Sequence, residues 1–152
     1  RISQETADQL QTSGLVQIAG PTLAEGVADQ TGWYTTNDLG EIDAQGRLSI
    51  TGRANRVINS GGLKVSLDAI ESAVAQIGGV VDAVAIVVTD TEWGERAAVV
   101  YVGSPEVADF IAADALTRLG VAAKPVRVIR IDAIPRLGSG KPDYQLLQSQ
   151  FG

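Results

Sequence analysis

The loop from Pro135 to Lys141 holds the residues whose types and spacing could do chemistry. It contains Gly138, Ser139 and Gly140 directly before Lys141. The pattern is close to a phosphate-binding P-loop. That motif, however, needs Gly five residues before the Gly-Lys pair and Ser or Thr after the Lys, where this chain has Pro135 and Pro142. The P-loop interpretation therefore fails.

The surroundings of Lys141 still suit a lysine that brings its positive charge to a bound ligand. Because Pro142 follows it, the α-helical region is disfavoured for Lys141, which is predicted to lie on an extended loop and reach outward. An ammonium group brought to a triphosphate can stabilise the charge that shifts over the α-phosphoryl oxygens when a carboxylate attacks. A solvent-exposed turn lysine fits the same segment, and this alternative stays open.

The composition narrows the remaining chemistry. Histidine and cysteine are absent, which excludes a Ser/His/Asp triad, thiolate nucleophiles, disulfides and most zinc sites. Lys, Arg, Asp, Glu and backbone groups must do any chemistry. Acidic residues outnumber basic ones by 18 to 12, for a net charge of -6, which argues against a nucleic-acid surface. No apolar run approaches the roughly 20 residues of a membrane span, and we expect a cytoplasmic protein.

Two regions with different sequence patterns meet near residues 51–53. Residues 1–51 are predicted to be all-β, with a strand at 15–19 and a hairpin whose strands, 39–43 and 47–51, flank a turn ending at Gly46. Such short strands cannot form a stable core alone, so this region is predicted to be the end of a larger domain. The chain opens without Met or a leader segment, and we interpret it as a cut piece.

Residues 52–152 are predicted to form a small α+β domain in which helices flank a three-stranded central sheet. The three strands are expected at 80–88, 97–102 and 126–131, after a brief strand pair around Ser60–Gly62. A first helix is expected between the N-cap Ser66 and the Gly78-Gly79 pair that ends it, and a last helix is expected at 144–151. The second helix should begin at Ser104-Pro105, and its predicted buried face consists of Val107, Ile111, Leu116 and Leu119.

Three motifs follow one another along the chain in a familiar order. Residues 32–40 match G-[WY]-[YF]-x-T-G-D-L-G, with Asn37 in place of a Gly. Residues 52–71 match G-R-x-D…G-G…I-E, and residues 135–141 match P-[RK]-x-x-S-G-K, with Leu137 in place of a common Thr. Together with a Trp-Gly-Glu segment at 93–95, they resemble the AMP-forming adenylating enzymes, which include acyl-CoA synthetases, luciferases and peptide-synthetase adenylation domains.

The resemblance implies nucleotide contacts and a hinge. Asp38 matches the carboxylate that accepts hydrogen bonds from both ribose hydroxyls of ATP, and Arg53 matches an arginine beside the ribose and phosphates. Asn55 stands at the hinge about which the small domain turns between two orientations, where relatives usually have Asp or Lys. A turn-forming Asp and a surface ion pair are the alternatives for Asp38 and Arg53.

The resemblance also implies a reaction in two steps. Lys141 matches the catalytic lysine of the first step, in which a carboxylic acid and ATP give an acyl-adenylate. Gly61 and Gly62 match the loop that lines the channel for CoA in the second step, although a simple tight turn would look the same. ATP and Mg2+ are expected to be bound mainly by the missing large N-terminal domain, and no metal site is expected in this chain.

Within the family, residues 60–65 and the Gly-Lys-Pro-Asp tail look most like the o-succinylbenzoate–CoA ligases of menaquinone biosynthesis. The expected partners are therefore a small carboxylic acid, ATP, CoA and the missing domain, with neither nucleic acid nor a membrane span; oligomerisation is left open. Another acyl- or aryl-CoA ligase, an adenylation domain that serves a carrier protein and a non-catalytic binding module remain as alternatives. The isolated fragment is expected to be inactive.

Overall fold

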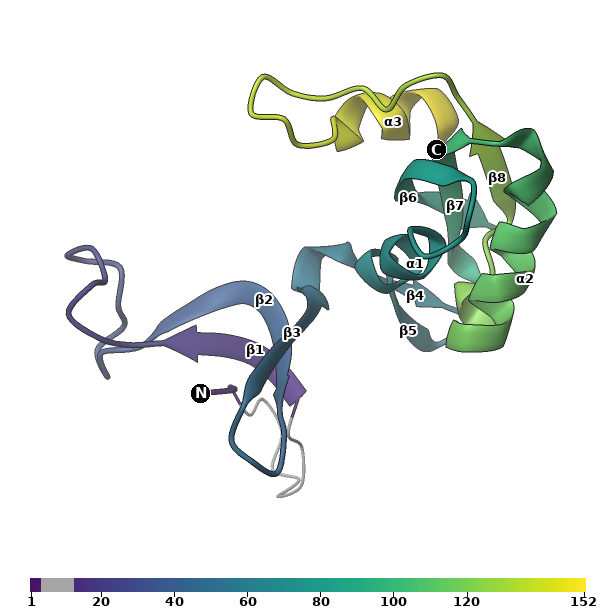
Figure 1. The fold of residues 1–152 in the computed structure, drawn as a ribbon. Helices are drawn as coiled ribbons and strands as arrows, with labels where there is room; N and C mark the ends of the chain where they lie inside the picture. Colours follow the sequence, from purple (N-terminus) through teal and green to yellow (C-terminus); the bar gives the residue numbers. More distant parts are fainter. Residues whose placement is uncertain (4–12) are drawn as a thin grey trace. The chain divides into compact units, whose positions relative to one another are not determined.

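The computed structural model describes residues 1–3 and 13–152. They form two compact units, an N-terminal unit from Arg1 to Arg56 and a C-terminal unit from Val57 to Gly152 (Figure 1). The division falls after Arg56, slightly beyond residues 51–53, where the sequence pattern changes. None of the helices in the described part of the chain is long and apolar enough to cross a membrane.

The N-terminal unit contains an antiparallel sheet of three strands in the order β1-β2-β3. The strands are β1 (Ser13–Ile18), β2 (Tyr34–Ile42) and β3 (Leu48–Arg53), and a short 3-10 turn, η1 (Ala54–Arg56), follows them. The β2–β3 turn ends at Gly46, whose φ of 77° lies in the left-handed region that favours glycine. The predicted hairpin is confirmed.

The C-terminal unit is α+β, as predicted, but its sheet has five strands rather than three. The main path runs β5-β4-β7-β6, and β8 pairs in parallel with β7. The additional pair, β4 and β5, joins β7 through a single bridge between Ser60 and Gly94. The elements are β4 (Val57–Ser60), β5 (Leu63–Ser66), α1 (Leu67–Val74), β6 (Val80–Asp90), β7 (Gly94–Gly103), α2 (Ala108–Leu119), β8 (Arg127–Arg130) and α3 (Tyr144–Phe151).

Helix α1 begins at the predicted cap. The Ser66 hydroxyl oxygen accepts a hydrogen bond from the Ala69 amide at 3.2 Å, which satisfies one of the free N–H groups of the first turn. Ile70 and Val74 of this helix are fully buried. The helix ends at Val74, earlier than the Gly78-Gly79 pair where the sequence pattern placed its end.

Strands β6 and β7 are apolar over most of their length because both of their faces are covered. Alternate residues point in opposite directions, so two separate clusters form. One face contributes Ala85, Ala97, Val99 and Tyr101 to a cluster that includes residues of α1 and α2. The other face contributes Val84, Ile86, Val88, Ala98 and Val100 to a cluster that includes Leu147 of α3 (Figure 1).

The second helix differs from its prediction. Pro105–Val107 forms a 3-10 turn, η2, and the α-helix proper begins only at Ala108. Its buried residues are Ile111 and Ala115, whereas Leu116 and Leu119 are 40% and 38% exposed. The predicted face is therefore wrong at its C-terminal half, where the small Ala115, four residues after Ile111, is buried in place of Leu116.

The outer edge of β6 is covered by side chains from two helices. Glu71 of α1 accepts a hydrogen bond from the Ala85 amide at 2.7 Å. Gln148 of α3 accepts one from the Val87 amide at 3.2 Å and donates one to the Val87 carbonyl at 2.6 Å. The Gln148 side-chain amide therefore takes the place that a neighbouring strand would occupy.

Candidate functional site

The N-terminal unit brings Asp38 and Arg53 together. They face each other across β2 and β3, and Arg53 Nε lies 3.2 Å from Asp38 Oδ1. Their side chains are 35% and 58% exposed, so this ion pair stabilises the fold by only about 0–1 kcal/mol. The Thr36 hydroxyl accepts a hydrogen bond from the Asp38 amide and fixes the strand locally. A partly exposed carboxylate and guanidinium thus lie side by side, able to bind hydroxyls and phosphate oxygens.

Asn55 lies in the middle of η1, and its side chain is exposed. The boundary between the two units falls shortly after it, between Arg56 and Val57. Every described residue with positive φ is a glycine, so the backbone of Asn55 has ordinary φ here. The hinge role of Asn55 stays a prediction.

Gly61 and Gly62 form the tight turn between β4 and β5, and their φ values are 59° and 83°. Gly61 also lies directly on the indole of Trp93. A Cβ atom at Gly61 would lie 2.5 Å from Cε3 of that ring, closer than any real contact allows. The Gly61 amide donates a hydrogen bond to the Trp93 carbonyl at 2.9 Å. The turn therefore combines a left-handed backbone with a close approach, and both require glycine.

The β6–β7 turn that carries Trp93 is held by Asp90. Its Oδ1 accepts hydrogen bonds from the amides of Trp93 at 2.8 Å and Glu92 at 2.9 Å. These two bonds and the charge of Arg96 hold the pKa of the Asp90 carboxyl below its usual range. The Arg96 guanidinium lies 4.9 Å from the centre of the Trp93 ring. Glu95 reaches back and accepts a hydrogen bond from the Asn59 amide at 2.9 Å, which joins the two turns.

Lys141 is carried by a small hairpin, and its side chain is exposed, as the sequence predicts. The Leu137 amide donates to the Lys141 carbonyl at 2.9 Å, and the Gly140 amide donates to the Leu137 carbonyl at 2.8 Å. Arg136 and Pro142 form an isolated bridge that closes the hairpin. Two of its residues, Pro135 and Asp143, are also joined by a backbone hydrogen bond of 2.8 Å. The ammonium group of Lys141 is thus presented on an ordered loop.

The lysine hairpin and the glycine turn are anchored at opposite ends of β6. Arg136 of the hairpin binds Asp82, near the beginning of the strand, whereas Gly61 binds Trp93, just beyond its end. At about 3.3 Å per residue, the stretch from Asp82 to Asp90 spans roughly 26 Å. One unit therefore presents two different loops from two different ends.

Comparison with known proteins identifies the family of one segment of the C-terminal unit. Residues 69–141 match the family model of the AMP-binding enzyme C-terminal domain. This segment belongs to that family. The match covers most of α1, the β6–β7 pair, α2, β8 and the lysine hairpin as far as Lys141.

Relatives of the AMP-binding enzyme C-terminal domain extend the similarity over most of the chain. The long-chain-fatty-acid–CoA ligase FadD13 of Mycobacterium tuberculosis is 38% identical over 126 residues, which are 82% of this chain and 25% of that ligase. The probable 2-succinylbenzoate–CoA ligase of the same organism is 30% identical over 152 residues, 91% of this chain and 40% of that ligase. The chain thus spans well under half the length of these relatives.

A solved structure gives the same fold. The amide bond synthetase McbA from Marinactinospora thermotolerans superposes with a TM-score of 0.81 and 25% identity, over 92% of this chain and 31% of that protein. Such a score over nearly the whole chain indicates the same order and packing of elements in both units.

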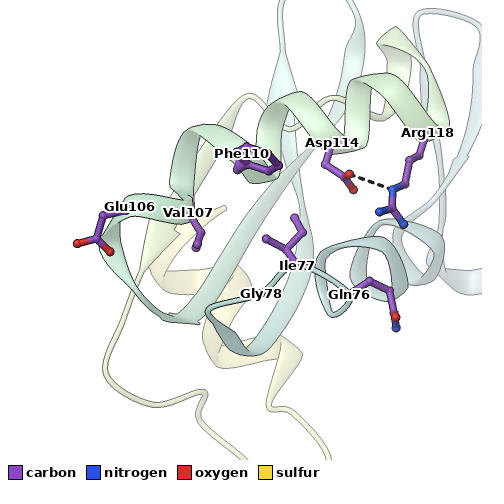
Figure 2. Close-up of a pocket in the computed structure, with 8 residues that line it drawn as sticks. All are labelled: Gln76, Ile77, Gly78, Glu106, Val107, Phe110, Asp114 and Arg118. Carbon is purple, nitrogen blue, oxygen red and sulfur yellow. Dashed lines mark hydrogen bonds and ion pairs between the residues drawn. The ribbon is translucent and has the colours of Figure 1, made fainter.

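A surface cavity of the AMP-binding enzyme C-terminal domain lies away from both loops. Its volume is about 320 Å³, and it lies between the segment that follows α1 and one side of η2 and α2 (Figure 2). It is lined by Gln76, Ile77, Gly78, Glu106, Val107, Phe110, Asp114 and Arg118. None of the predicted site residues is among them, so this cavity does not mark the predicted chemistry.

Two features of this domain were not assigned a role from the sequence. Trp93 was noticed only as part of a motif, although its ring explains why Gly61 must be glycine. Arg136 was likewise noticed only as a motif residue, although it connects the lysine hairpin to the sheet. Both contacts join residues more than thirty positions apart, which local patterns do not reveal.

Proposed function

We propose that this chain is the C-terminal part of an ATP-dependent, AMP-forming carboxylate–CoA ligase and that it is inactive alone. The observation that carries the proposal is the anchoring of the Lys141 hairpin and the Gly61–Gly62 turn at opposite ends of one strand in an AMP-binding enzyme C-terminal domain. Loops anchored so far apart favour a reaction in which each loop approaches the reacting groups in an orientation of its own. A reaction in two steps, with a reorientation between them, uses both.

In the first step, Lys141 would stabilise charge on the α-phosphoryl oxygens while the carboxylate of the substrate attacks and pyrophosphate leaves. Asp38 would bind the ribose hydroxyls, and Arg53 would lie beside the phosphates. The closeness of this pair, 3.2 Å, supports a shared ligand. Mg2+ usually binds substrate phosphates and one or two carboxylates, and we propose that the missing large domain holds it together with ATP.

In the second step, rotation at Asn55 would bring the Gly61–Gly62 turn to the acyl-adenylate in place of Lys141. The CoA thiol would then attack the acyl carbon and release AMP. A backbone without side chains allows a thin pantetheine arm to approach closely. The position of Asn55, next to the boundary between the units, supports it as the place where the backbone turns.

For the acid, we propose o-succinylbenzoate. The support is the likeness to the probable 2-succinylbenzoate–CoA ligase, which matches 91% of this chain. The higher identity to the fatty-acid ligase FadD13, 38%, favours a long-chain acid as the second candidate. Assaying the full-length protein with o-succinylbenzoate, a long-chain fatty acid and an aryl acid, and comparing kcat/KM, distinguishes them.

The test of the reaction itself is Lys141→Ala in the full-length protein. Loss of one preorganised charge from a transition state costs about 10²-fold in rate. We expect the rate of acyl-adenylate formation, measured as pyrophosphate release, to fall by about that factor. Thioester formation from supplied acyl-adenylate should stay near the wild-type rate.

Lys124→Ala is the matched control, since Lys124 is another exposed lysine of the same unit. It should leave adenylation unchanged, and circular dichroism should show that both variants are folded. Equal slowing of both half-reactions by Lys141→Ala, or of neither, would make Lys141 a structural residue and contradict the proposed role.

A further inference from the structure

The side chain of Arg136 joins three parts of the C-terminal unit. Its Nη2 atom donates to Oδ2 of Asp82, near the beginning of β6. Its Nη1 atom donates to the carbonyl of Gly140 at 2.8 Å. Its backbone lies opposite Pro142 across the hairpin. One guanidinium therefore spans the sheet and the tip of the loop, a geometry that its planar set of donors allows.

The contact with Gly140 acts directly on Lys141. The Gly140 carbonyl and the Lys141 nitrogen belong to one planar peptide unit, which also contains the Cα atom of Lys141. Holding the Gly140 oxygen therefore orients the bond from which the lysine side chain extends. Gly140 itself has a φ of 82°, a region that glycine enters and leaves easily, so the tip needs such a restraint.

The other end of this link is itself fixed. Oδ1 of Asp82 accepts a hydrogen bond from the Ala83 amide at 2.9 Å, which leaves Oδ2 directed to Arg136. The backbone hydrogen bonds of the hairpin join the loop to itself. The ion pair between Arg136 and Asp82 instead joins it to β6, so it sets the direction of the whole hairpin.

We propose that Arg136 and Asp82 act as a clamp that positions Lys141 for acyl-adenylate formation. This inference rests on the proposed function and deepens it. The side chains of Arg136 and Asp82 are 43% and 32% exposed, and ion pairs so exposed contribute little to stability. The clamp therefore acts on the position of the lysine, not on whether the domain folds.

The experiment uses Arg136→Gln in the full-length protein. Misplacing a catalytic group by about 1 Å costs up to about 10²-fold. We expect Arg136→Gln to slow adenylation about tenfold with an unchanged KM for ATP, and to leave thioester formation from supplied acyl-adenylate unchanged. Arg136→Lys, which keeps the charge but only one of the two contacts, should fall between wild type and Arg136→Gln.

Arg118→Gln is the matched control. Arg118 is also partly exposed and forms an ion pair with an aspartate, Asp114, at 2.9 Å, but on α2. It should leave both half-reactions unchanged. A second readout is specific to positioning: in a Lys141→Ala background, Arg136→Gln should slow adenylation by less than about twofold, since there is no ammonium left to position. A full tenfold loss in that background, or equal slowing of both half-reactions, overturns the proposal.

Hydrogen exchange separates failure of the clamp from failure of the proposed function. The amides of Leu137 and Gly140 are hydrogen-bonded within the hairpin, and we expect them to exchange faster in Arg136→Gln but not in Arg118→Gln. If the wild type forms no acyl-adenylate from any acid, the proposed function fails. Faster exchange would then show that Arg136 still holds the hairpin in place without that reaction, and unchanged exchange would overturn the clamp as well.

Discussion

The β2–β3 hairpin of the N-terminal unit and the β6–β7 hairpin of the C-terminal unit are built by the same local chemistry. In each, an aspartate at the turn accepts two backbone amide hydrogen bonds: Asp43 from Gln45 and Arg47, and Asp90 from Glu92 and Trp93. The strands of the two hairpins differ completely in how far their side chains are buried. Leu48 and Ile50 of β3 are 47% and 58% exposed, whereas β6 and β7 are covered on both faces.

This difference shows that the same turn chemistry occurs with and without a buried core around the hairpin. Val16 is the only buried hydrophobic residue of the N-terminal unit among those that the structure describes, and all other buried hydrophobic residues belong to the C-terminal unit. The exposed apolar residues of the N-terminal sheet include Ile18, Tyr34, Leu48 and Ile50. We expect the large domain of the full-length protein to cover them.

The largest effect should distinguish the cores of the two units. Ile70 is fully buried, and Ile70→Ala should lower the free energy of unfolding of the C-terminal unit by about 2–5 kcal/mol because it leaves a cavity. Ile50→Ala should change the free energy of unfolding of the N-terminal unit by less than about 0.5 kcal/mol, since Ile50 is exposed. Urea titration followed by Trp93 fluorescence in a Trp33→Phe background measures the C-terminal unit, and Trp33 fluorescence in a Trp93→Phe background measures the N-terminal unit.

Ile70→Val is the control for this pair, with an expected loss of about 0.5–1.5 kcal/mol. If Ile50→Ala destabilised the isolated chain as much as Ile70→Ala, the N-terminal unit would have a core of its own. The contrast between the units would then be wrong.

A smaller effect should come from the glycine turn. Gly61→Ala introduces both a left-handed φ and a clash with Trp93, whereas Gly62→Ala introduces the φ alone, because nothing lies within 4 Å of its Cβ position. We expect losses in unfolding free energy of about 2–4 kcal/mol for Gly61→Ala and about 1–2 kcal/mol for Gly62→Ala. Urea titration of both variants measures the difference.

A Trp93→Ala change provides the double-mutant test. If the clash is the cause of the difference, Gly61→Ala should cost no more than Gly62→Ala when the indole is absent. Equal losses for the two glycine variants in the presence of Trp93 would show that the close contact has no energetic consequence.

The smallest effect should be the loss of two turns at low pH, one in each unit. The pKa of Asp43 is lowered by the backbone and side-chain hydrogen bonds from Arg47, and that of Asp90 by the backbone bonds from Trp93 and Glu92. A carboxyl whose pKa is lower in the folded state stabilises the fold above the unfolded pKa of about 3.9 and loses that contribution as the pH falls through the lowered value. Both turns should therefore loosen only in acid.

The measurement is a titration of the two turns by NMR, with Asp43→Asn and Asp90→Asn as controls that remove each transition. A midpoint at or above the ordinary Asp pKa for either residue would contradict its hydrogen-bonded state. A large difference between the two turns would show that burial of the surrounding sheet affects this local chemistry.

The sequence was most informative where a few neighbouring residues decide the structure. The cap at Ser66, the turn at Gly46 and helix α3 follow from side-chain oxygens, backbone freedom and periodicity within a few positions. The sequence was least informative where a residue far away in the chain decides the local structure. The joining of β4 to β7, and the burial of Ala115 instead of Leu116, depend on which elements pack together.

The candidate site divides in the same way. The motif around Lys141 predicts an exposed lysine on a loop, and the structure confirms that exposure. The roles of Asp38, Arg53, Asn55, Gly61, Gly62 and Lys141 in catalysis stay predictions. The partner of Arg136 could not be predicted, because Asp82 lies 54 positions away and many aspartates were available to it.

The covered edge of β6 has a consequence for the order of events during synthesis. Glu71 precedes the strand, so the Ala85 amide can be satisfied as soon as β6 leaves the ribosome. Gln148 follows Val87 by 61 residues, which at about 5–20 residues per second corresponds to a delay of roughly 3–12 s. During that interval the middle of β6 is an open template for another nascent strand, and completion of the last helix closes it.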